Sequence, residues 1–134
     1  MKKNKIIIFG TGGHAKTILA EIIRLKKYKV IGYIDEFKPI GTIIDEQYNL
    51  INLGRIKDLN SIADKNTFGV IGVFANYIRK RISNQVYKVS KKFKWEKIVS
   101  ADAVIQRKVE IGEGTVIIVG SIIKTGTNIG KHCV

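Results

Sequence analysis

The sequence has one cysteine, one proline and no long apolar run, and each scarcity excludes a class of protein. A single cysteine, Cys133, rules out an internal disulfide and is typical of a reducing cytoplasm. A membrane-spanning helix needs about 20 consecutive apolar residues, and no run approaches that length. The run Ile6–Phe9 is also shorter than the roughly 7–15 residues of a signal-peptide core. We therefore expect a cytoplasmic protein with no membrane partner, and interpret this run as a β-strand.

Acidic residues are also scarce, since 11 Asp and Glu residues stand against 24 Lys and Arg residues and leave a net charge of +13. Up to Lys97 there are 20 basic and 8 acidic residues, so nearly all of the excess lies in this part. A basic surface can attract nucleic acid or phosphorylated small molecules. The lysines are dispersed and not set among aromatic residues, which favours an ordinary basic surface over a nucleic-acid interface. Nucleic-acid binding remains an alternative.

Strand-like and helical patterns alternate before Ile98. Apolar runs predict strands at 5–10, 29–35 and 67–73, and amphipathic spacing predicts helices at 14–28, 54–66 and 76–92. This alternation is typical of parallel strands joined by crossover helices. We therefore predict a small Rossmann-like parallel α/β domain of three or four strands over residues 1–97.

The period changes after Ile98, where an aliphatic residue recurs at every sixth position. The series is Val99, Ile105, Ile111, Ile117, Ile123 and Ile129. A step of six fits a coil of short strands in which one aliphatic side chain per side points inward, and three sides close a coil of about 18 residues. Residues 98–134 are predicted to form about two coils of a parallel β-helix that stops in mid-repeat, and is thus expected to be incomplete.

A glycine-rich loop stands between the first predicted strand and helix. Its sequence is Gly10-Thr11-Gly12-Gly13-His14-Ala15. Glycines let a backbone approach a phosphate closely, and a helix N-terminus offers free N–H groups and positive potential. Asp35 and Glu36 follow the second strand, where an acidic side chain can accept hydrogen bonds from ribose hydroxyls. The alternative interpretation is a tight structural turn with an acidic loop after the second strand.

The stretches "IIIFGTGGHAK" and "IGYIDE", combined with the terminal six-residue repeat, resemble the sugar O-/N-acyltransferases of the sialic acid O-acetyltransferase type. That group includes the N-acetyltransferases of UDP-linked 4-amino sugars. The resemblance implies that the repeat is a left-handed β-helix and that the α/β domain binds a nucleotide sugar or sialic acid. It also implies acetyl-CoA as co-substrate, a homotrimer, and a catalytic histidine in a segment beyond Val134. No catalytic residue is therefore assigned within the chain, and its own activity is left open.

The segment "IGVFANYIRKRI" resembles a glycine–asparagine–arginine segment of the same family. On this basis Gly72, Asn76 and Arg79 join the candidate substrate-binding residues. A solvated helix face is the alternative for the arginines. His132 is expected at a corner of the coil, pointing outward and without a catalytic role. Two histidines, one cysteine and scattered carboxylates do not form a metal site.

Two further functions stay open on sequence alone. The chain could be a non-enzymatic module that binds a nucleotide sugar, or a basic protein that binds nucleic acid.

Overall fold

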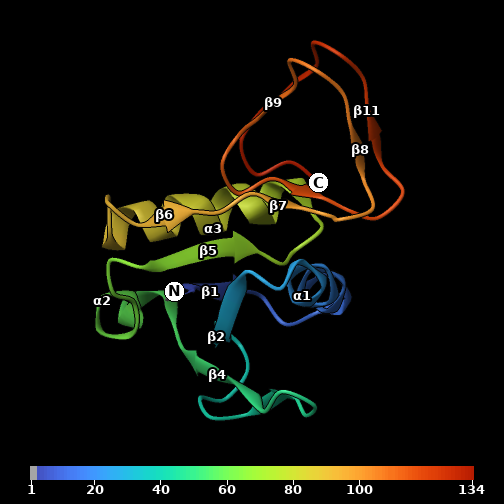
Figure 1. The fold of residues 1–134 in the computed structure, drawn as a ribbon. Coiled ribbons are helices and arrows are strands. Elements are labelled where there is room, and N and C mark those ends of the chain that lie inside the picture. The colour runs from blue at the N-terminus through green and yellow to red at the C-terminus, as the bar shows by residue number, and fades with distance from the viewer. Residues whose placement is uncertain (1–2) are drawn as a thin grey trace.

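The computed structural model describes residues 3–134 and contains a mixed sheet flanked by helices and followed by a three-sided coil (Figure 1). The sheet has six strands in the order β3-β4-β2-β1-β5-β6. These are β1 (Asn4–Phe9), β2 (Tyr28–Ile34), β3 (Ile43–Asp45), β4 (Leu50–Gly54), β5 (Thr67–Ile71) and β6 (Lys94–Trp95). Neighbouring strands pair in parallel except β3 and β4, which are antiparallel.

The expectation of three or four parallel strands is therefore too low. The three predicted strands are β1, β2 and β5, and the sequence patterns missed β3, β4 and β6. The strands β3 and β6 have only three and two residues, which is too short for an alternating pattern to emerge. Their conformation depends on pairing with β4 and β5, a tertiary effect that local sequence does not carry.

Helices cover both faces of the sheet. They are α1 (Gly13–Leu25), the 3-10 turn η1 (Ile56–Asp58), α2 (Leu59–Ile62) and α3 (Asn76–Val89). Ile6 and Ile8 of β1 pack on the α1 side, and Ile7 and Phe9 pack on the side of α2 and α3. Successive side chains of a strand point to opposite faces, so an unbroken apolar run suits a central strand that is buried on both sides.

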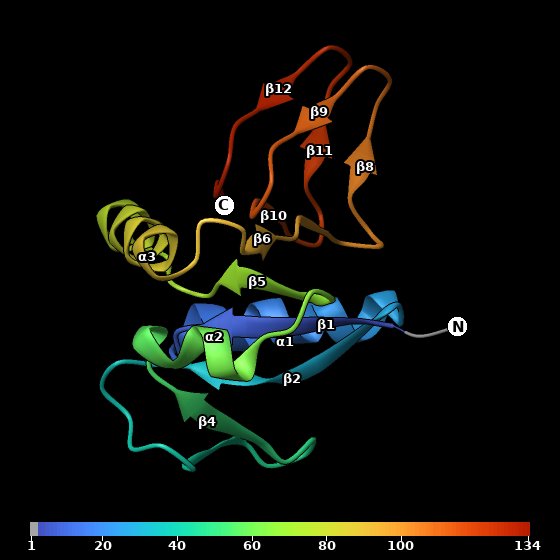
Figure 2. The same cartoon turned by 90° about the vertical axis from the view of Figure 1, so that its left-hand side faces the viewer.

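The coil consists of β7 (Ile98–Val99), β8 (Val104–Ile105), β9 (Glu110–Ile111), β10 (Val116–Ile117), β11 (Ile122–Ile123) and β12 (Asn128–Ile129). It pairs β7 with β10, β8 with β11 and β9 with β12, always between residues 18 positions apart. Figure 1 shows its triangular outline, and Figure 2 shows β11 beside β8 and β12 beside β9. Ile117 is 6% exposed and the next residue, Ile118, is 37% exposed, as the six-residue register predicts for this pair. Ile105, at another inward position of the register, is 37% exposed. The arrangement fits a Rossmann-like domain followed by the start of a β-helix.

The coil packs directly on the α/β domain. Ile98 and Val116 are buried in the same apolar cluster as Ile18 and Ile22 of α1. An ion pair between Arg24 and Asp102 also joins α1 to the corner that follows β7. The two parts therefore share a core at α1.

Candidate substrate-binding site

The glycine loop leads from the end of β1 into the first turn of α1. Gly10 has a φ of 100°, and a Cβ atom there would lie 2.7 Å from Cγ2 of Val73. Gly12 caps α1 without a side-chain hydrogen bond, and no acidic residue stands in the first turn. A Cβ atom at Gly12 or Gly13 would meet no atom within 4 Å. The backbone of these two glycines therefore borders open space, where an anionic group can approach the N–H groups of the first turn.

A hydrogen bond ties the loop to the end of β2. The Thr11 hydroxyl donates to Oδ2 of Asp35 across 2.9 Å. The backbone N–H groups of Phe37 and Lys38 donate to Oδ1 of Asp35 at 2.8 and 3.0 Å. Burial alone would raise the pKa of Asp35, but these hydrogen bonds and the charge of Lys38 lower it overall. Asp35 is thus an ionised carboxylate at neutral pH, engaged with its own loop through both oxygens.

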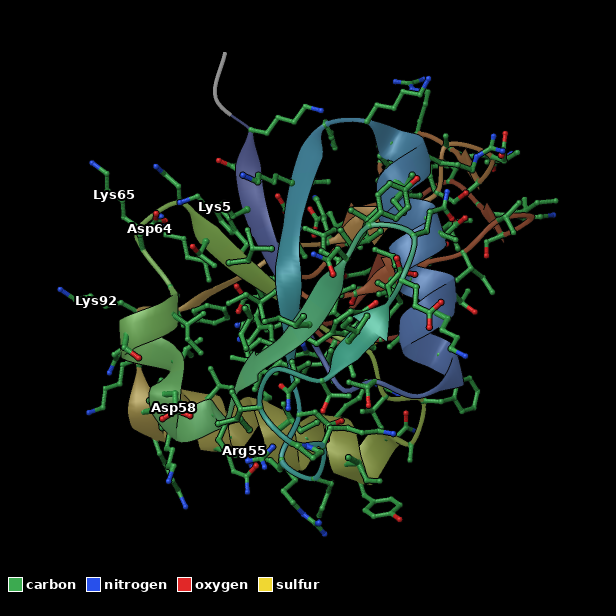
Figure 3. The ribbon with its side chains drawn as sticks, turned by 90° about the horizontal axis from the view of Figure 1, so that it is seen from below. Lys5, Arg55, Asp58, Asp64, Lys65 and Lys92 are labelled. Atoms are coloured by element: carbon green, nitrogen blue, oxygen red, sulfur yellow. The ribbon has the colours of Figure 1, made fainter. Side chains whose placement is uncertain are left out.

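Two residues that the sequence patterns did not single out hold the turn after β2. Asn52 of β4 is fully buried, and its amide donates to the carbonyl oxygen of Lys38 at 2.8 Å. Arg55 donates to the carbonyl oxygens of Asp35 and Lys38. The N–H of Arg55 in turn donates to the Asp58 carboxylate at 2.9 Å. Arg55 directly follows β4, and Asp58 lies in the η1 turn that comes next (Figure 3). An asparagine within the apolar strand "LINLG" was the available signal, because buried polar groups need partners.

These elements enclose a pocket of about 370 Å³. One wall is the glycine loop and the end of β2, and the other wall is α3, which contributes Ile78, Arg81, Ile82 and Gln85. The full lining is Phe9, Gly10, Thr11, Gly12, Ile34, Asp35, Glu36, Phe37, Ile56, Val73, Ile78, Arg81, Ile82 and Gln85. The pocket combines an apolar floor with two carboxylates, one guanidinium group and a helix N-terminus, a combination typical of a small-molecule site.

Five of the ten predicted site residues line this pocket, namely Gly10, Thr11, Gly12, Asp35 and Glu36. Gly13 follows in the same loop. The others, His14, Gly72, Asn76 and Arg79, lie outside the pocket lining. Gly72 serves packing, because a Cβ atom there would lie 2.8 Å from the Cβ of Ala15. The glycine lets the end of β5 approach the start of α1.

Arg79 is 7% exposed and joins α3 to the coil. Its Nε donates to the carbonyl oxygen of His132 at 2.9 Å. The rest of the guanidinium group donates to the carbonyl oxygens of Val73 and Phe74 and to the side chain of Asn76. Arg79 therefore does not lie on a solvated helix face. It lines a separate pocket together with Phe74, Ala75, Asn76 and Val134, and its role in substrate binding stays a prediction. The arginine of α3 that lines the pocket at the glycine loop is Arg81.

His14 sits at the start of α1 and does not line this pocket. Its ring lies edge-on to Phe74, with 5.6 Å between ring centroids. Burial, and next the nearby charge of Arg79, lower the pKa of His14. Its Nε2 is buried without a hydrogen-bond partner among the described residues. His14 is therefore a neutral imidazole at neutral pH, placed between the loop and the β5–α3 connection.

His132 points out of the coil, as predicted, but it does not reach solvent freely. Its ring lies edge-on to Trp95, with 4.8 Å between centroids, and Trp95 in turn contacts Phe9 at 5.2 Å. Burial lowers the pKa of His132, the Glu113 charge opposes this effect, and the charges of Lys131 and Arg79 add to it. The six-residue repeat predicts that the His132 side chain points out of the coil, but not that Trp95 of the α/β domain covers its ring.

Among residues 3–134, no cluster of three or more His, Cys, Asp or Glu side chains is arranged to hold a metal ion. Within the same residues, no helix is long and apolar enough to cross a membrane.

The family described as the PglD N-terminal domain matches residues 5–86 of the sequence, which include the glycine loop, Asp35 and most of α3. The chain belongs to this family. The resemblance to sugar acyltransferases predicted from the sequence is thereby confirmed. No curated protein sequence matches the chain.

Solved structures extend the likeness to the coil. The acetyltransferase domain of PglB from Neisseria gonorrhoeae, in complex with acetyl coenzyme A, is 22% identical with a TM-score of 0.81, over 98% of this chain and 60% of that one. A mutant of perosamine N-acetyltransferase from Caulobacter crescentus, in complex with CoA and GDP-perosamine, is 18% identical with a TM-score of 0.80, over 96% and 58%. The chain thus spans about three fifths of the length of these structures, and at these identities the likeness shows the fold.

Proposed function

We propose that this chain forms the nucleotide-sugar-binding part of an acetyl-CoA-dependent sugar N- or O-acetyltransferase. The observation that carries the proposal is the pocket itself, where a glycine loop with open backbone, two carboxylates and Arg81 converge. Family membership supports the same conclusion, as do structural neighbours that bind acetyl coenzyme A or CoA with GDP-perosamine.

Each part of the pocket suits one part of a nucleotide sugar. The N–H groups at Gly12 and Gly13 and the positive end of α1 suit a phosphate, and Arg81 on the opposite wall adds a permanent positive charge. Both oxygens of Asp35 already accept hydrogen bonds from the protein. Glu36 is more exposed and accepts only one long hydrogen bond, from the N–H of Ile56 to Oε1 at 3.4 Å, so its other oxygen is available to ribose hydroxyls. In this assignment Asp35 positions the loop and Glu36 contacts the ligand.

The reaction transfers an acetyl group from the thioester of acetyl-CoA to an amine or hydroxyl of the sugar. A base removes a proton from the acceptor, the acceptor attacks the thioester carbonyl carbon, and the carbon–sulfur bond breaks to release CoA. The residues of this chain supply binding and orientation, which reduce the entropic cost of bringing the acceptor to the donor. A general base beyond Val134, a left-handed coil and a homotrimer remain predictions that rest on the family resemblance.

Calorimetric titration tests the binding proposal. UDP- and GDP-linked 4-amino sugars, free sialic acid and duplex DNA should be compared at two salt concentrations. We expect saturable binding of at least one nucleotide-linked sugar, and weaker or no binding of sialic acid, because only the linked sugars present a phosphate to the glycine loop.

The other outcomes separate the alternatives. Binding of sialic acid alone would place the sugar, and not its nucleotide, in the pocket. Tight DNA binding with a steep salt dependence would favour a nucleic-acid function. Release of CoA from acetyl-CoA in the presence of a bound sugar would add catalysis to binding, whereas binding without CoA release by the 134-residue chain is compatible with both the enzyme part and a non-enzymatic module.

A further inference from the structure

Phe37 is 93% exposed, the largest exposed fraction among the exposed large hydrophobic side chains. It follows Glu36 directly, at the rim of the pocket of about 370 Å³. Exposing an aromatic ring to water is unfavourable, since burial of apolar surface is the main driving force of folding. A ring exposed beside a ligand pocket is available to contact a bound group, and contact would remove its apolar surface from water.

The turn that carries Phe37 is fixed, so the ring cannot reach the core by a small adjustment. The N–H of Phe37 donates to Oδ1 of Asp35 at 2.8 Å. Asn52 and Arg55 hold the carbonyl groups on either side of Phe37, at Asp35 and Lys38. Ordering the backbone of this turn before the ligand arrives lowers the entropy lost on binding. The turn is thus preorganised to present Phe37 at the pocket.

Other exposed aromatic rings near the glycine loop already have partners. Phe74 packs edge-on against His14, and the ring of Tyr77 lies 6.0 Å from the guanidinium carbon of Arg81. Among residues 3–134, Phe37 has no aromatic or cationic neighbour of this kind. Its face is free for a flat ligand group.

We propose that Phe37 stacks on the base of the bound nucleotide, an inference that rests on the proposed nucleotide-sugar function of this pocket. Phosphates bind at the glycine loop and ribose hydroxyls at Glu36, so the base is the remaining part of the nucleoside and extends toward the next residue of the turn. Every nucleobase has a π-face, so aromatic stacking tolerates different bases. Phe37 therefore contributes affinity for the nucleoside, and hydrogen bonds from other groups choose among bases.

The test compares ligands with and without a base. UDP, GDP and ribose 5-phosphate are titrated into the wild-type chain, Phe37→Ala and Ile40→Ala. Ile40 is a matched control because it is 60% exposed in the same loop but does not line the pocket. We expect Phe37→Ala to bind UDP and GDP about tenfold more weakly and ribose 5-phosphate as well as the wild type does. Ile40→Ala should bind all three ligands normally.

A second variant measures stacking directly. Phe37→Trp should keep nucleotide affinity, and its added fluorescence should fall when UDP or GDP binds and stay constant with ribose 5-phosphate. Equal nucleotide affinity of Phe37→Ala and wild type, with no fluorescence change in Phe37→Trp, would overturn the stacking role and leave nucleotide binding intact. An equal loss for all three ligands would show that Phe37 supports the turn and not the base. Absence of nucleotide binding by the wild type would overturn both proposals.

Discussion

Thr11 donates a hydrogen bond from Oγ1 to Oδ2 of Asp35 across 2.9 Å, and so ties the glycine loop after β1 to the turn after β2. The two strands are neighbours in the sheet, so their carboxyl ends lie side by side. Ligands of open α/β sheets bind outside the carboxyl ends of the strands. The bond between these two pocket-lining side chains therefore joins the glycine loop to the turn after β2 at this edge of the sheet.

Replacing Thr11 by valine should weaken nucleotide-sugar binding while the fold persists. The change removes the hydroxyl donor and leaves Oδ2 of Asp35 without this partner. Because the site is half-buried, we expect the free energy of unfolding to fall by only about 1 kcal/mol. Thr11→Ser keeps the donor and should restore affinity. Calorimetry and urea unfolding measure both effects, and wild-type affinity in Thr11→Val would show that the link is not needed.

Substitutions at Gly10 and Gly12 should have different effects, the first on the free energy of unfolding and the second on ligand affinity. An alanine at Gly10 must adopt a φ of 100° and place its Cβ atom 2.7 Å from Val73, so Gly10→Ala should lower the free energy of unfolding by about 1–3 kcal/mol. A valine at Gly12 projects into open space. Gly12→Val should fold normally and lose nucleotide-sugar affinity because its side chain fills the phosphate approach. Normal binding by Gly12→Val would remove this loop from the site.

Arg79 and Arg81 of α3 should also differ, with Arg79 contributing to stability and Arg81 to ligand binding. Arg79→Gln removes buried donors to the carbonyl groups of Phe74 and His132, so it should lower the free energy of unfolding by about 2–3 kcal/mol. It should also increase proteolysis of the segment 90–97, which leads from α3 into the coil. Arg81→Gln should leave stability unchanged and weaken nucleotide-sugar binding, most clearly at low salt. The reverse result would mean that Arg79, as the family resemblance suggested, is the ligand-binding arginine.

Stability should fall as the pH decreases below about 6.5. Burial lowers the pKa values of His14 and His132 in the folded chain, so the unfolded chain binds more protons between those lowered values and 6.5. The unfolding free energy therefore rises with pH in that window. His132→Gln should flatten the profile and leave the slope due to His14. Urea unfolding at pH 5.0 and 7.5 is the measurement, and an unchanged slope in His132→Gln would contradict the burial of this ring.

The repeating and strongly periodic parts of the fold were predictable from the sequence. A residue such as Ile117 is buried because an 18-residue coil places it inside the coil, and the spacing of six carries that information directly. The helix α1 was predicted at 14–28 and lies at Gly13–Leu25. The position of the glycine loop between β1 and α1 was also predictable, whereas phosphate binding at this loop stays a prediction.

Contacts between distant segments were not predictable in this way. Arg79 lies on α3 and donates a hydrogen bond to the carbonyl oxygen of His132, 53 residues away. No local sequence pattern predicts that these two residues are in contact. Asn52 lies in β4 and Arg55 directly follows that strand, and both hold the turn that carries Phe37. The sequence patterns did not predict β4. Side chains that act through tertiary contacts carry no periodic signal, so their roles emerge only once the strands are placed.

The measurement that tests the central claim most directly is a titration of the uniformly ¹⁵N-labelled chain with a UDP- or GDP-linked 4-amino sugar, followed by amide chemical shifts. We expect the largest changes at the N–H groups of Gly12, Gly13 and His14 and in the turn from Glu36 to Lys38, with smaller changes on α3 near Arg81. Changes centred instead on the separate pocket lined by Leu19, Lys26 and Tyr28, or no changes with either ligand at saturating concentration, would contradict the central claim.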